Sequence, residues 1–543
     1  MSRQRPADAM TGGEAVVAAL RHHGIDTLFG LPGVQLDHLF NALHPARNEL
    51  RIINARHEQG VAYMALGYAQ ATGRIGVYAC VPGPGFLNTS AALSTAYAVH
   101  APVLALIGQI ASDRIGKGGG ELHELPDQTA IVKGLTRWSG IARAPADVPG
   151  LMAEAFARIE AGQAPAAVEL PADVLRQTME RSGPSNADPV PLPAPAAEAI
   201  EAAAACLAGA TAPLIVVGIG AVEAGVALKR IAERLQAPVL GHLQGRGILD
   251  TQHPLSVRRA EAFRLWPETD VILAVGTRFH TPRRHWGLKP HQRVIRIDLD
   301  ASQFARGEAP EIAIHADARA ALSALADALD RRDVRRTSRA NEIARLKQAT
   351  ADEFERVLGP QMRYIEALRS VLPEDSIFVA DYTQIGYVAT AALPVSRPRL
   401  MLTPGYQGTL GFAYATALGA KVGCPDQPVV ALCGDGGFLF TGNELATAVQ
   451  HDIRAIAVVF VDGAYGNVRR MQEDLYGGRV IASNLTNPDF VAFAESFGAA
   501  ARRADSPAEL ADALRWALGQ SGPVLIEVPV PKMPDPWDLL EPA

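Results

Sequence analysis

The sequence predicts an α/β protein built from three doubly wound parallel-sheet domains. Short continuous apolar runs that end near glycines, such as residues 429–433 and 456–461, are typical of parallel strands covered on both faces. A chain of 543 residues is long enough for about three to four domains. Two changes in composition along the chain favour three.

Those two changes mark the predicted domain boundaries. Proline and small polar residues at 183–191 predict an extended linker, because proline removes a backbone donor and restricts the residue before it. A charged stretch at 331–336 leads into a helix that we expect to be solvated. We therefore expect a first domain over residues 1–183, a central domain over 190–330 and a last domain over 352–543.

Composition narrows the class of partner and the compartment. The hydrophobic fraction of 48% supports full cores, and the net charge of −6 provides no broad basic field, so nucleic acid is not expected as a partner. The N-terminal residues lack the apolar stretch of a secretory signal, and no run approaches the ~18 apolar residues of a membrane helix. The cysteines are scattered without metal-ligand spacing. We expect a cytoplasmic protein with no membrane partner.

The most informative motif is Gly434-Asp435-Gly436, with Asp462 27 residues after Asp435 (462 − 435). Both aspartates follow predicted buried strands, and ligands of open α/β sheets bind beyond the carboxyl ends of such strands. Mg²⁺ prefers carboxylate and phosphate oxygens, and glycines let backbone N–H groups approach a phosphate. Taken alone, Gly-Asp-Gly could also be a plain turn between a strand and a helix.

Together the two aspartates resemble the diphosphate-binding motif of thiamine diphosphate enzymes, in which an Asn or Asp that holds the metal follows Gly-Asp-Gly at such an interval. The resemblance implies thiamine diphosphate and Mg²⁺ as cofactors, with Asp435, Asp462 and the carbonyl of Ala464 as metal ligands. Many relatives carry paired Asn where this chain has Val461-Asp462. The cofactor contacts implied here are Gly434, Asp435, Gly436, Gly437, Asp462, Ala464, Tyr465, Gly466 and Asn467.

A second motif, Arg56-His57-Glu58-Gln59-Gly60, lies far upstream. The same resemblance makes Glu58 the glutamate that protonates the aminopyrimidine ring of the cofactor, which assigns pyrimidine binding to the first domain and diphosphate binding to the last. A proton shared with the ring nitrogen favours the imino tautomer, whose exocyclic nitrogen can then remove the proton from the thiazolium carbon. An exposed glutamate at a helix start is the alternative for this residue taken alone.

The resemblance to the acetolactate synthase, benzaldehyde lyase and benzoylformate decarboxylase branch of this family extends over nearly the whole chain. Residues 11–17 and 28–33 resemble the opening of such enzymes, and residues 81–88 resemble their second glycine turn. Residues 408–412 resemble the segment that places a bulky apolar residue, here Leu410, under the bent cofactor. The further cofactor contacts implied are Gly33, Pro84, Asn88 and Gly408.

The predicted central domain carries weak signals for a nucleotide. Residues 214–220 indicate a strand and a glycine turn, but Glu223 stands where a dinucleotide motif has its third glycine. Residues 271–279 resemble the strand and turn that meet FAD in acetolactate synthases, whereas residues 280–284 depart from their acidic continuation, which leaves FAD doubtful. Relatives use this domain for FAD, for ADP or for nothing. Four arginines could instead clamp a phosphate or tie subunits together: Arg258, Arg278, Arg283 and Arg284.

The side chains that face the reactive carbon differ from those of the relatives. Val34 stands where benzoylformate decarboxylases carry Ser, and Gln35 where benzaldehyde lyase carries His. His123 takes the place of a glutamine that reaches the active site in relatives, so it could shuttle protons with Gln35 beside it, although a solvated loop histidine is the alternative. Gln109, directly after a predicted strand, is a further catalytic candidate.

Two more residues bear on the substrate. Arg137 aligns with a lysine of relatives and could hold a carboxylate, which favours an anionic substrate, although an arginine stacked beside Trp138 is the alternative. Asn467 and Met471 replace the Met and Trp typical of acetolactate synthases, and Met471 would face the substrate. This difference argues against a standard biosynthetic acetolactate synthase.

The resemblance as a whole implies a 2-oxo acid decarboxylase or carboligase, that is, a lyase or transferase acting on C–C bonds next to a carbonyl. A lyase that cleaves acyloins, like benzaldehyde lyase, is the first alternative, and a cofactor-binding homologue without turnover is the second. The expected substrates are a 2-oxo acid or acyloin and an aldehyde or ketone acceptor. Because Glu58 and Asp435 lie on different predicted domains, relatives form each site between two chains, which implies a homodimer or homotetramer.

Overall fold

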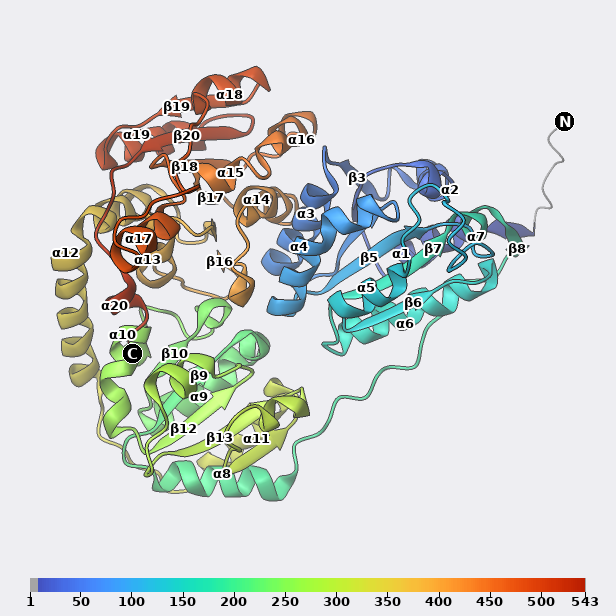
Figure 1. Cartoon of the computed structure of the whole chain (residues 1–543). Coiled ribbons are helices and arrows are strands. Elements are labelled where there is room, and N and C mark those ends of the chain that lie inside the picture. Colours follow the sequence, from blue (N-terminus) through green and yellow to red (C-terminus); the bar gives the residue numbers. More distant parts are fainter. Residues whose placement is uncertain (1–7, 543) are drawn as a thin grey trace, which may run out of the picture.

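The computed structural model describes residues 8–542, which form three parallel sheets of six strands each, interleaved with helices (Figure 1). In Figure 1 the first sheet lies on the right, the central sheet at the bottom and the last sheet at the upper left. The prediction of an α/β protein with three parallel-sheet units is confirmed. Residues 181–196 carry no helix or strand and connect the first unit to the central one as an extended segment.

The first sheet has the strand order β3-β2-β4-β5-β7-β6, and every neighbouring pair is parallel. Strand β2 lies between β3 and β4, so the chain builds outward from it in both directions, which makes the sheet doubly wound. A short antiparallel pair, β1 (Ala9–Thr11) with β8 (Thr178–Glu180), lies apart from the sheet. The strands are β2 (Thr27–Gly30), β3 (Arg51–Asn54), β4 (Gly76–Cys80), β5 (Val103–Gln109), β6 (Trp138–Ile141) and β7 (Ala166–Pro171); the helices are α1 (Gly12–His22), α2 (Asp37–Leu43), α3 (Glu58–Thr72), α4 (Pro84–Val99), α5 (Gln128–Leu135), α6 (Val148–Glu160) and α7 (Ala172–Arg176).

The central sheet has the order β11-β10-β9-β12-β13-β14 and is also parallel throughout. Most of the buried apolar residues of this unit form two clusters, which include alternate residues of its strands. The strands are β9 (Leu214–Val217), β10 (Val239–Gly241), β11 (Ser256–Val257), β12 (Val271–Val275), β13 (Arg293–Asp298) and β14 (Ile312–His315); the helices are α8 (Ala197–Gly209), α9 (Gly225–Leu235), α10 (Arg259–Leu265) and α11 (Ala318–Asp330).

The last sheet has the order β16-β15-β17-β18-β20-β19, again parallel. Helix α12 (Ala340–Val371) precedes it and changes direction at Leu358, whose φ and ψ are not helical. The strands are β15 (Ile377–Ala380), β16 (Met401–Leu402), β17 (Val429–Gly434), β18 (Ile456–Val461), β19 (Ala500–Arg503) and β20 (Val524–Pro529); the helices are α13 (Gln384–Ala392), α14 (Phe412–Gly423), α15 (Asp435–Phe438), α16 (Leu445–Gln450), α17 (Gly466–Leu475), α18 (Phe490–Ser496), α19 (Pro507–Leu518) and α20 (Trp537–Leu540).

The first and last units are joined through helices α3 and α14. Glycines bring the two backbones together, since a Cβ at Gly67 would lie 1.9 Å from the carbonyl oxygen of Thr416 and one at Gly419 would lie 1.8 Å from that of Met64. Close packing of this kind leaves no room for even a methyl group. One buried apolar cluster accordingly runs through both units. This contact fixes how the two units lie relative to each other within one chain.

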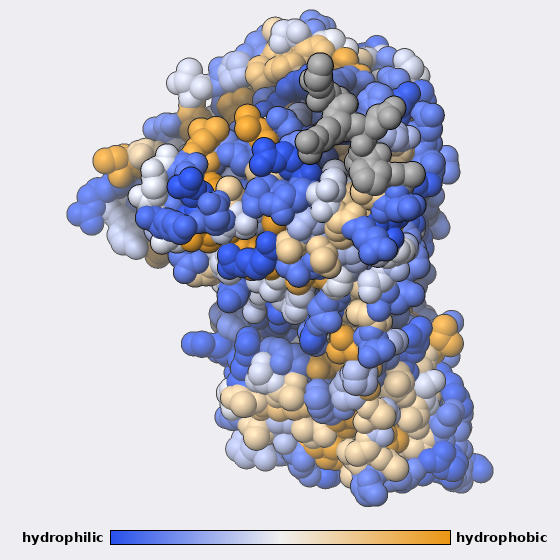
Figure 2. Space-filling view, turned by 90° about the vertical axis from the view of Figure 1, so that its right-hand side faces the viewer, coloured by the Kyte–Doolittle hydropathy of each residue, from blue (hydrophilic) through white to orange (hydrophobic). Residues whose placement is uncertain are grey.

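The surface is that of a protein whose apolar residues are mostly inside. Seen from the side of the first unit, polar residues intermix with smaller groups of apolar ones (Figure 2). Within residues 8–542, no helix combines the length and the apolar character needed to cross a membrane.

Candidate active site

A cavity of about 270 Å³ lies at the carboxyl ends of strands β15, β17 and β18. This is the edge at which ligands bind in doubly wound sheets. The cavity gathers predicted cofactor contacts that are separated by up to 59 residues along the chain (408 to 467). The predicted contacts in its lining are Gly408, Leu410, Gly434, Asp435, Gly436, Gly437, Asp462, Ala464, Tyr465, Gly466 and Asn467.

Asp435 is held in this cavity with its carboxylate fully engaged. The residue is 1% exposed, and burial raises the pKa of its carboxyl group. Its Oδ1 accepts a hydrogen bond from the Gly436 N–H at 2.8 Å, and its Oδ2 accepts from the Gly463 N–H at 2.9 Å. The Asn487 side chain donates to Oδ2 at 2.7 Å. Asn487 belongs to no motif, so sequence reasoning did not find it.

Asp462 faces the same cavity from the end of β18. Its Oδ2 accepts from the Gln384 side chain at 2.8 Å, and its Oδ1 accepts from the Ala464 N–H at 3.2 Å. Burial, and then the negative charge of Asp435, raise the pKa of Asp462 to about 6. Two carboxylates that repel each other in a buried place are the arrangement that a divalent cation stabilises.

The donor set fits an oxygen-ligated ion such as Mg²⁺. Residues 8–542 contain no cluster of three or more His, Cys, Asp and Glu side chains that could hold a metal by themselves. Mg²⁺ usually binds through one or two carboxylates and completes its shell with phosphate oxygens and water. Asp435 and Asp462, with a backbone carbonyl such as that of Ala464, are therefore a sufficient protein contribution.

A diphosphate fits beside these carboxylates. Helix α17 begins at Gly466 in the lining of the cavity, and its first N–H groups have no acceptor within the helix, which favours an anion there. A Cβ at Gly436 would lie 2.7 Å from the ring of Tyr465, and one at Gly466 would lie 2.5 Å from the Asp462 carboxylate. Glycine at both positions therefore keeps the cradle compact and lets backbone reach a ligand.

Asp381 also lines the cavity and was missed by the sequence analysis. It is 3% exposed, and burial raises the pKa of its carboxyl group to about 6. Its carboxylate accepts from the Tyr382 N–H at 3.0 Å and from the Gly411 N–H at 3.1 Å. It thereby fixes the turn next to Leu410. The only signal in the sequence is an acidic residue directly after the apolar strand β15.

Glu58 is the first residue of helix α3, in the first unit. Its Oε2 accepts a hydrogen bond from the Asn88 side chain of α4 at 3.0 Å. The buried carboxylate of Glu444, in the last unit, accepts from the backbone N–H groups of Arg56 and His57 at 3.1–3.2 Å. A Cβ at Gly60 would lie 2.3 Å from the same carboxylate. Glu444, which sequence reasoning also missed, therefore fixes the segment that presents Glu58.

Gln35 and His123 lie side by side on the same unit. The distance from His123 Nδ1 to Gln35 Oε1 is 3.2 Å. His123 has a φ of 68°, a left-handed conformation that costs a residue other than glycine about 1–2 kcal/mol. Its carbonyl oxygen lies against Gly83, where a Cβ would be only 2.4 Å away. The neighbour Val34 is 66% exposed.

Gln109 lies behind this surface instead of on it. It is 3% exposed, and its amide donates to Glu169 at 3.0 Å, while its own oxygen accepts from the Ile110 N–H. Gln128 donates to the same Glu169 carboxylate and accepts from the Gly83 N–H at 2.9 Å. This buried network supports the turn at Gly83 that precedes α4. The structure gives Gln109 a contact with that network and none with the cavity.

The remaining contacts implied by the resemblance lie near Glu58 or on α17. A Cβ at Gly33 would lie 2.5 Å from Val81, which also closes on Gly85, and Pro84 is the first residue of α4. Met471 is 47% exposed on α17, and Trp537 donates to the Asn467 side chain at 2.9 Å.

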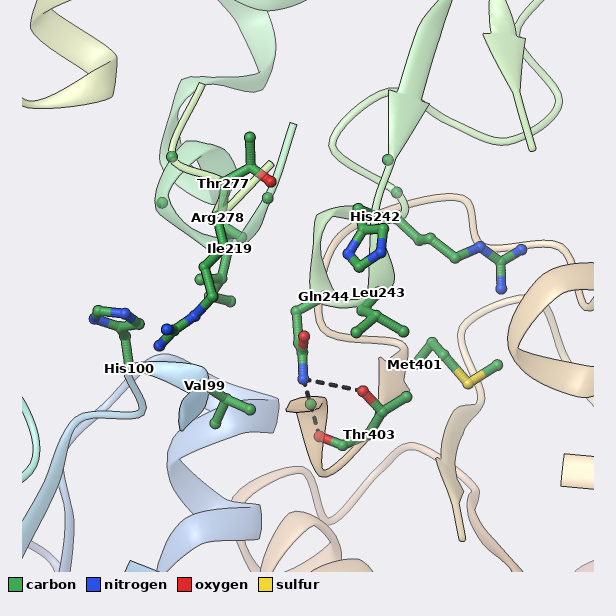
Figure 3. A pocket seen from close by; sticks show the side chains of 18 of the residues that line it. Val99, His100, Ile219, His242, Leu243, Gln244, Thr277, Arg278, Met401 and Thr403 are labelled. Carbon is green, nitrogen blue, oxygen red and sulfur yellow. Dashed lines mark hydrogen bonds between the residues drawn. The ribbon is translucent and has the colours of Figure 1, made fainter. Parts of the chain in front are cut away.

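Arg137 lines a different and larger cavity, of about 1940 Å³, between the three units. Its guanidinium lies 4.3 Å from the centre of the Tyr97 ring and 3.2 Å from His100 Nε2, so its aromatic partner is Tyr97. Figure 3 shows this cavity, with Gln244 bonded to Thr403 across it at 2.9 and 3.0 Å. The three units contribute Val99 and His100, then Ile219, His242, Leu243, Gln244, Thr277 and Arg278, then Met401 and Thr403.

The glycine turns of the central unit serve packing. The Gly220 N–H donates to the Gly276 carbonyl at 3.1 Å, and a Cβ at Gly218 would lie 2.5 Å from the same oxygen. That N–H group is therefore already used inside the protein. Of the four arginines, Arg258 pairs with Glu261 at 2.9 Å, Arg278 lies 4.2 Å from the Tyr406 ring, Arg283 contacts Gly307, and Arg284 is exposed.

Comparisons with known proteins agree with this geometry. Three family models match: the N-terminal thiamine pyrophosphate (TPP) binding domain of thiamine pyrophosphate enzymes over residues 10–131, their central domain over 200–325, and their C-terminal TPP binding domain over 381–528.

Similar proteins include a probable 2-ketoarginine decarboxylase of Pseudomonas aeruginosa, which is 34% identical over 96% of this chain and 95% of its own. An acetolactate synthase of Mycobacterium bovis is 29% identical over 98% and 90% of the two chains. A sulfoacetaldehyde acetyltransferase of Castellaniella defragrans is 29% identical over 94% and 90%. This chain belongs to the thiamine pyrophosphate enzyme family, in its acetolactate synthase-like branch.

Proposed function

We propose that the protein is a thiamine diphosphate- and Mg²⁺-dependent 2-oxo acid decarboxylase or carboligase whose active site forms between two copies of the chain. The observation that carries the proposal is that the predicted site residues form two separate half-sites. One contains Asp435 and Asp462 and is called the metal half, and the other contains Glu58 and is called the Glu58 half. The diphosphate cavity is lined by residues of the last unit alone, from Asp381 to Val530, whereas Glu58 lies with Asn88 on the first unit. The names of the relatives support decarboxylation or C–C bond formation as the class of reaction.

Exposed apolar side chains border both half-sites. Around the Glu58 half these side chains are Val34, Leu87 and Leu122, which are 66%, 40% and 61% exposed. On helix α17, beside the metal half, they are Val468, Met471 and Leu475, which are 51%, 47% and 65% exposed. Exposed apolar groups next to a functional site are typical of a surface that is covered in the working assembly. The first unit of one copy, placed over the last unit of another, would cover both borders and complete the site.

Bound thiamine diphosphate supplies the electron sink that lets a C–C bond next to a carbonyl break or form. The residues of this chain provide position and protons. Asp435 and Asp462 would hold the cation, the start of α17 would hold the diphosphate, and the apolar side chain of Leu410 would pack against the cofactor. Glu58 would share a proton with the pyrimidine ring, and Asn88 orients its carboxylate for that role. His123 would face the substrate from the same half-site, with the buried Gln35 beside it.

Turnover by the purified protein with thiamine diphosphate and Mg²⁺ tests this function. We expect carbon dioxide from at least one of pyruvate, benzoylformate, glyoxylate and 2-ketoarginine, read together with the carbonyl products. Cleavage of benzoin without carbon dioxide release from any oxo acid would contradict the proposal and establish the acyloin lyase instead. Cofactor binding without any turnover of these donors would favour a non-catalytic homologue.

The proposed reaction needs no flavin. The Gly220 N–H, which a dinucleotide-binding turn would offer to a phosphate, is used inside the protein by Gly276. We therefore expect the purified protein to be colourless and active without added FAD. A yellow preparation whose activity falls when the flavin is removed would contradict this part of the proposal.

A further inference from the structure

We infer that Gln35 is a positioning residue that fixes the tautomer of His123, so that the imidazole presents an unprotonated Nε2 to the substrate. The inference rests on the proposed function for the identity of that substrate, but its structural part concerns the protein alone. Gln35 lies in the short 3₁₀ helix Val34–Leu36, and His123 lies in the loop before α5.

The hydrogen bonds of Gln35 determine which of its amide atoms faces His123. Its Nε2 donates to the carbonyl oxygen of Leu122 at 3.0 Å. Turning the amide over would place two oxygens against each other, so Oε1 must be the atom that lies 3.2 Å from His123 Nδ1. An amide oxygen only accepts. Nδ1 of His123 therefore carries the hydrogen, and in a neutral imidazole Nε2 then has a free lone pair.

Both partners are held firmly. Gln35 is 6% exposed, and its short helix is closed by the bond from the Leu36 N–H to the Gly33 carbonyl at 2.7 Å. The His123 backbone is fixed against Gly83. The carboxylate of Glu124 accepts from the N–H groups of Gly118 and Gly120 at 3.0 and 2.7 Å, which closes the loop on itself.

The pair lies on the half-site that carries Glu58. The turn at Gly83 contacts the His123 carbonyl, and two residues later a Cβ at Gly85 would lie 3.4 Å from Glu58 Oε1. His123 is half-buried, and its Nε2 makes no hydrogen bond with any group of residues 8–542. The free acceptor nitrogen of His123 is thus part of the same half-site as Glu58.

An acceptor nitrogen selects among substrate groups. A carboxylate only accepts hydrogen bonds and gains nothing from a neutral Nε2, whereas a hydroxyl group donates to it. His123 Nε2 therefore recognises compounds that carry a hydroxyl group next to the reacting carbon, such as the hydroxy ketone product of a carboligation. Recognition of the carboxylate of an oxo acid must come from other groups.

Nitrogen NMR of the ¹⁵N-histidine-labelled holoenzyme tests the tautomer directly and needs no turnover. The signals that His123→Gln removes belong to His123. We expect a protonated Nδ1 and an unprotonated Nε2 in the unmodified protein, and a shift toward protonated Nε2 in Gln35→Leu. A protonated Nε2 in the unmodified protein, or an unchanged pattern in Gln35→Leu, would overturn the inference.

A double-mutant cycle on kcat tests whether Gln35 acts through His123. His123→Gln should lower kcat by about 10²-fold or more, as loss of a proton-transfer group does. Gln35→Leu should lower kcat in the natural background and have no further effect in the His123→Gln background, with thiamine diphosphate affinity unchanged in all variants. An equal loss in both backgrounds would refute the positioning role. If no donor is turned over, the proposed function fails while the NMR result still decides the tautomer.

Discussion

The two half-sites of this protein differ in how complete each is within one chain. In the last unit, Asp435 is 1% exposed and each carboxylate oxygen already has a hydrogen-bond donor from the same unit. In the first unit, Glu58 is half-buried and, within residues 8–542, accepts a side-chain hydrogen bond from Asn88 alone, which is itself exposed. The half proposed to bind the metal (the metal half) is thus preorganised, while the half proposed to activate the cofactor (the Glu58 half) is open.

This difference indicates how the work is divided between the two half-sites. A divalent cation is attracted by carboxylates that repel each other, so the protein must hold these carboxylates in place before the cation and the diphosphate bind. A proton-sharing glutamate needs low dielectric only when the cofactor is bound, and a partner subunit can supply that cover. The contrast predicts that substitutions in the Glu58 half lower kcat, whereas substitutions in the metal half weaken the binding of metal and cofactor.

Replacement of Glu58 should cause the greatest loss of activity and tests the Glu58 half. Glu58→Gln removes the carboxyl proton but keeps the size and the contact with Asn88, so kcat should fall by about 10²–10⁴-fold, as in the loss of a general acid–base group. Thiamine diphosphate affinity, measured by fluorescence titration, should change little. Glu49→Gln, at an exposed glutamate paired with Arg21, is the matched control and should leave kcat unchanged. Equal loss of cofactor affinity in Glu58→Gln would remove the contrast between the halves.

Mixing two inactive variants tests whether the halves meet across chains. If a site takes Glu58 from one copy and Asp435 from another, dissociating and re-associating Glu58→Gln with Asp435→Asn produces hybrid dimers with one intact site each. Random association then restores about a quarter of the natural number of sites. Activity of the mixture, compared with that of each variant alone, is the measurement. No recovery after proven subunit exchange would show that each site lies within one chain.

A smaller effect concerns the support of the metal half. Asn487→Ala removes the donor at 2.7 Å from Asp435 Oδ2, and loss of such an orienting contact typically weakens metal affinity by about 10–100-fold. Activity should recover when Mg²⁺ is raised, because the first half is untouched. Asn484→Ala, at an exposed residue three positions earlier, is the control. A fall in kcat that excess Mg²⁺ does not restore would contradict a role limited to the metal.

The sequence allowed the fold to be predicted because its signals are local. Each buried parallel strand reads as a short apolar run, and strands β17 and β18 carry their polar residues directly at their ends. The predicted cofactor contacts that line the cavity of about 270 Å³ fall in a few short segments, so motifs of adjacent residues predicted them together.

Asp381, Gln384, Glu444 and Asn487 could not be found in this way. Each is a single polar residue with ordinary neighbours, and each reaches the site only because distant segments fold against one another. Asp381 contacts the turn at Gly411, 30 residues later, and Glu444 holds the backbone of Arg56 across 388 residues. Arg137, which alignment with a lysine of relatives predicted to hold a carboxylate, lines the larger cavity between the three units, and its role stays a prediction. Only tertiary packing decides such positions.

The dependence of stability on pH should be modest, and it tests whether the carboxylates of the metal half repel each other. The pKa of Asp462 is raised from 3.8 to about 6 in the folded protein, so the folded state keeps a proton that the unfolded chain has already lost. Without metal, this carboxyl group therefore lowers stability as the pH rises through that window, and Asp381 and Asp435 act with the same sign. Mg²⁺ binds the ionised form, so its stabilisation should grow over the same window.

In thermal unfolding with a chelator, Asp462→Asn should gain about 2–4 °C in Tm over the natural protein above pH 6 and nothing well below the window. The contradicting outcome is that, without metal, the Tm of the natural protein rises relative to that of Asp462→Asn as the pH increases from about 4 to about 6. The two carboxylates would then not repel each other, and the preorganisation of this half would require another cause.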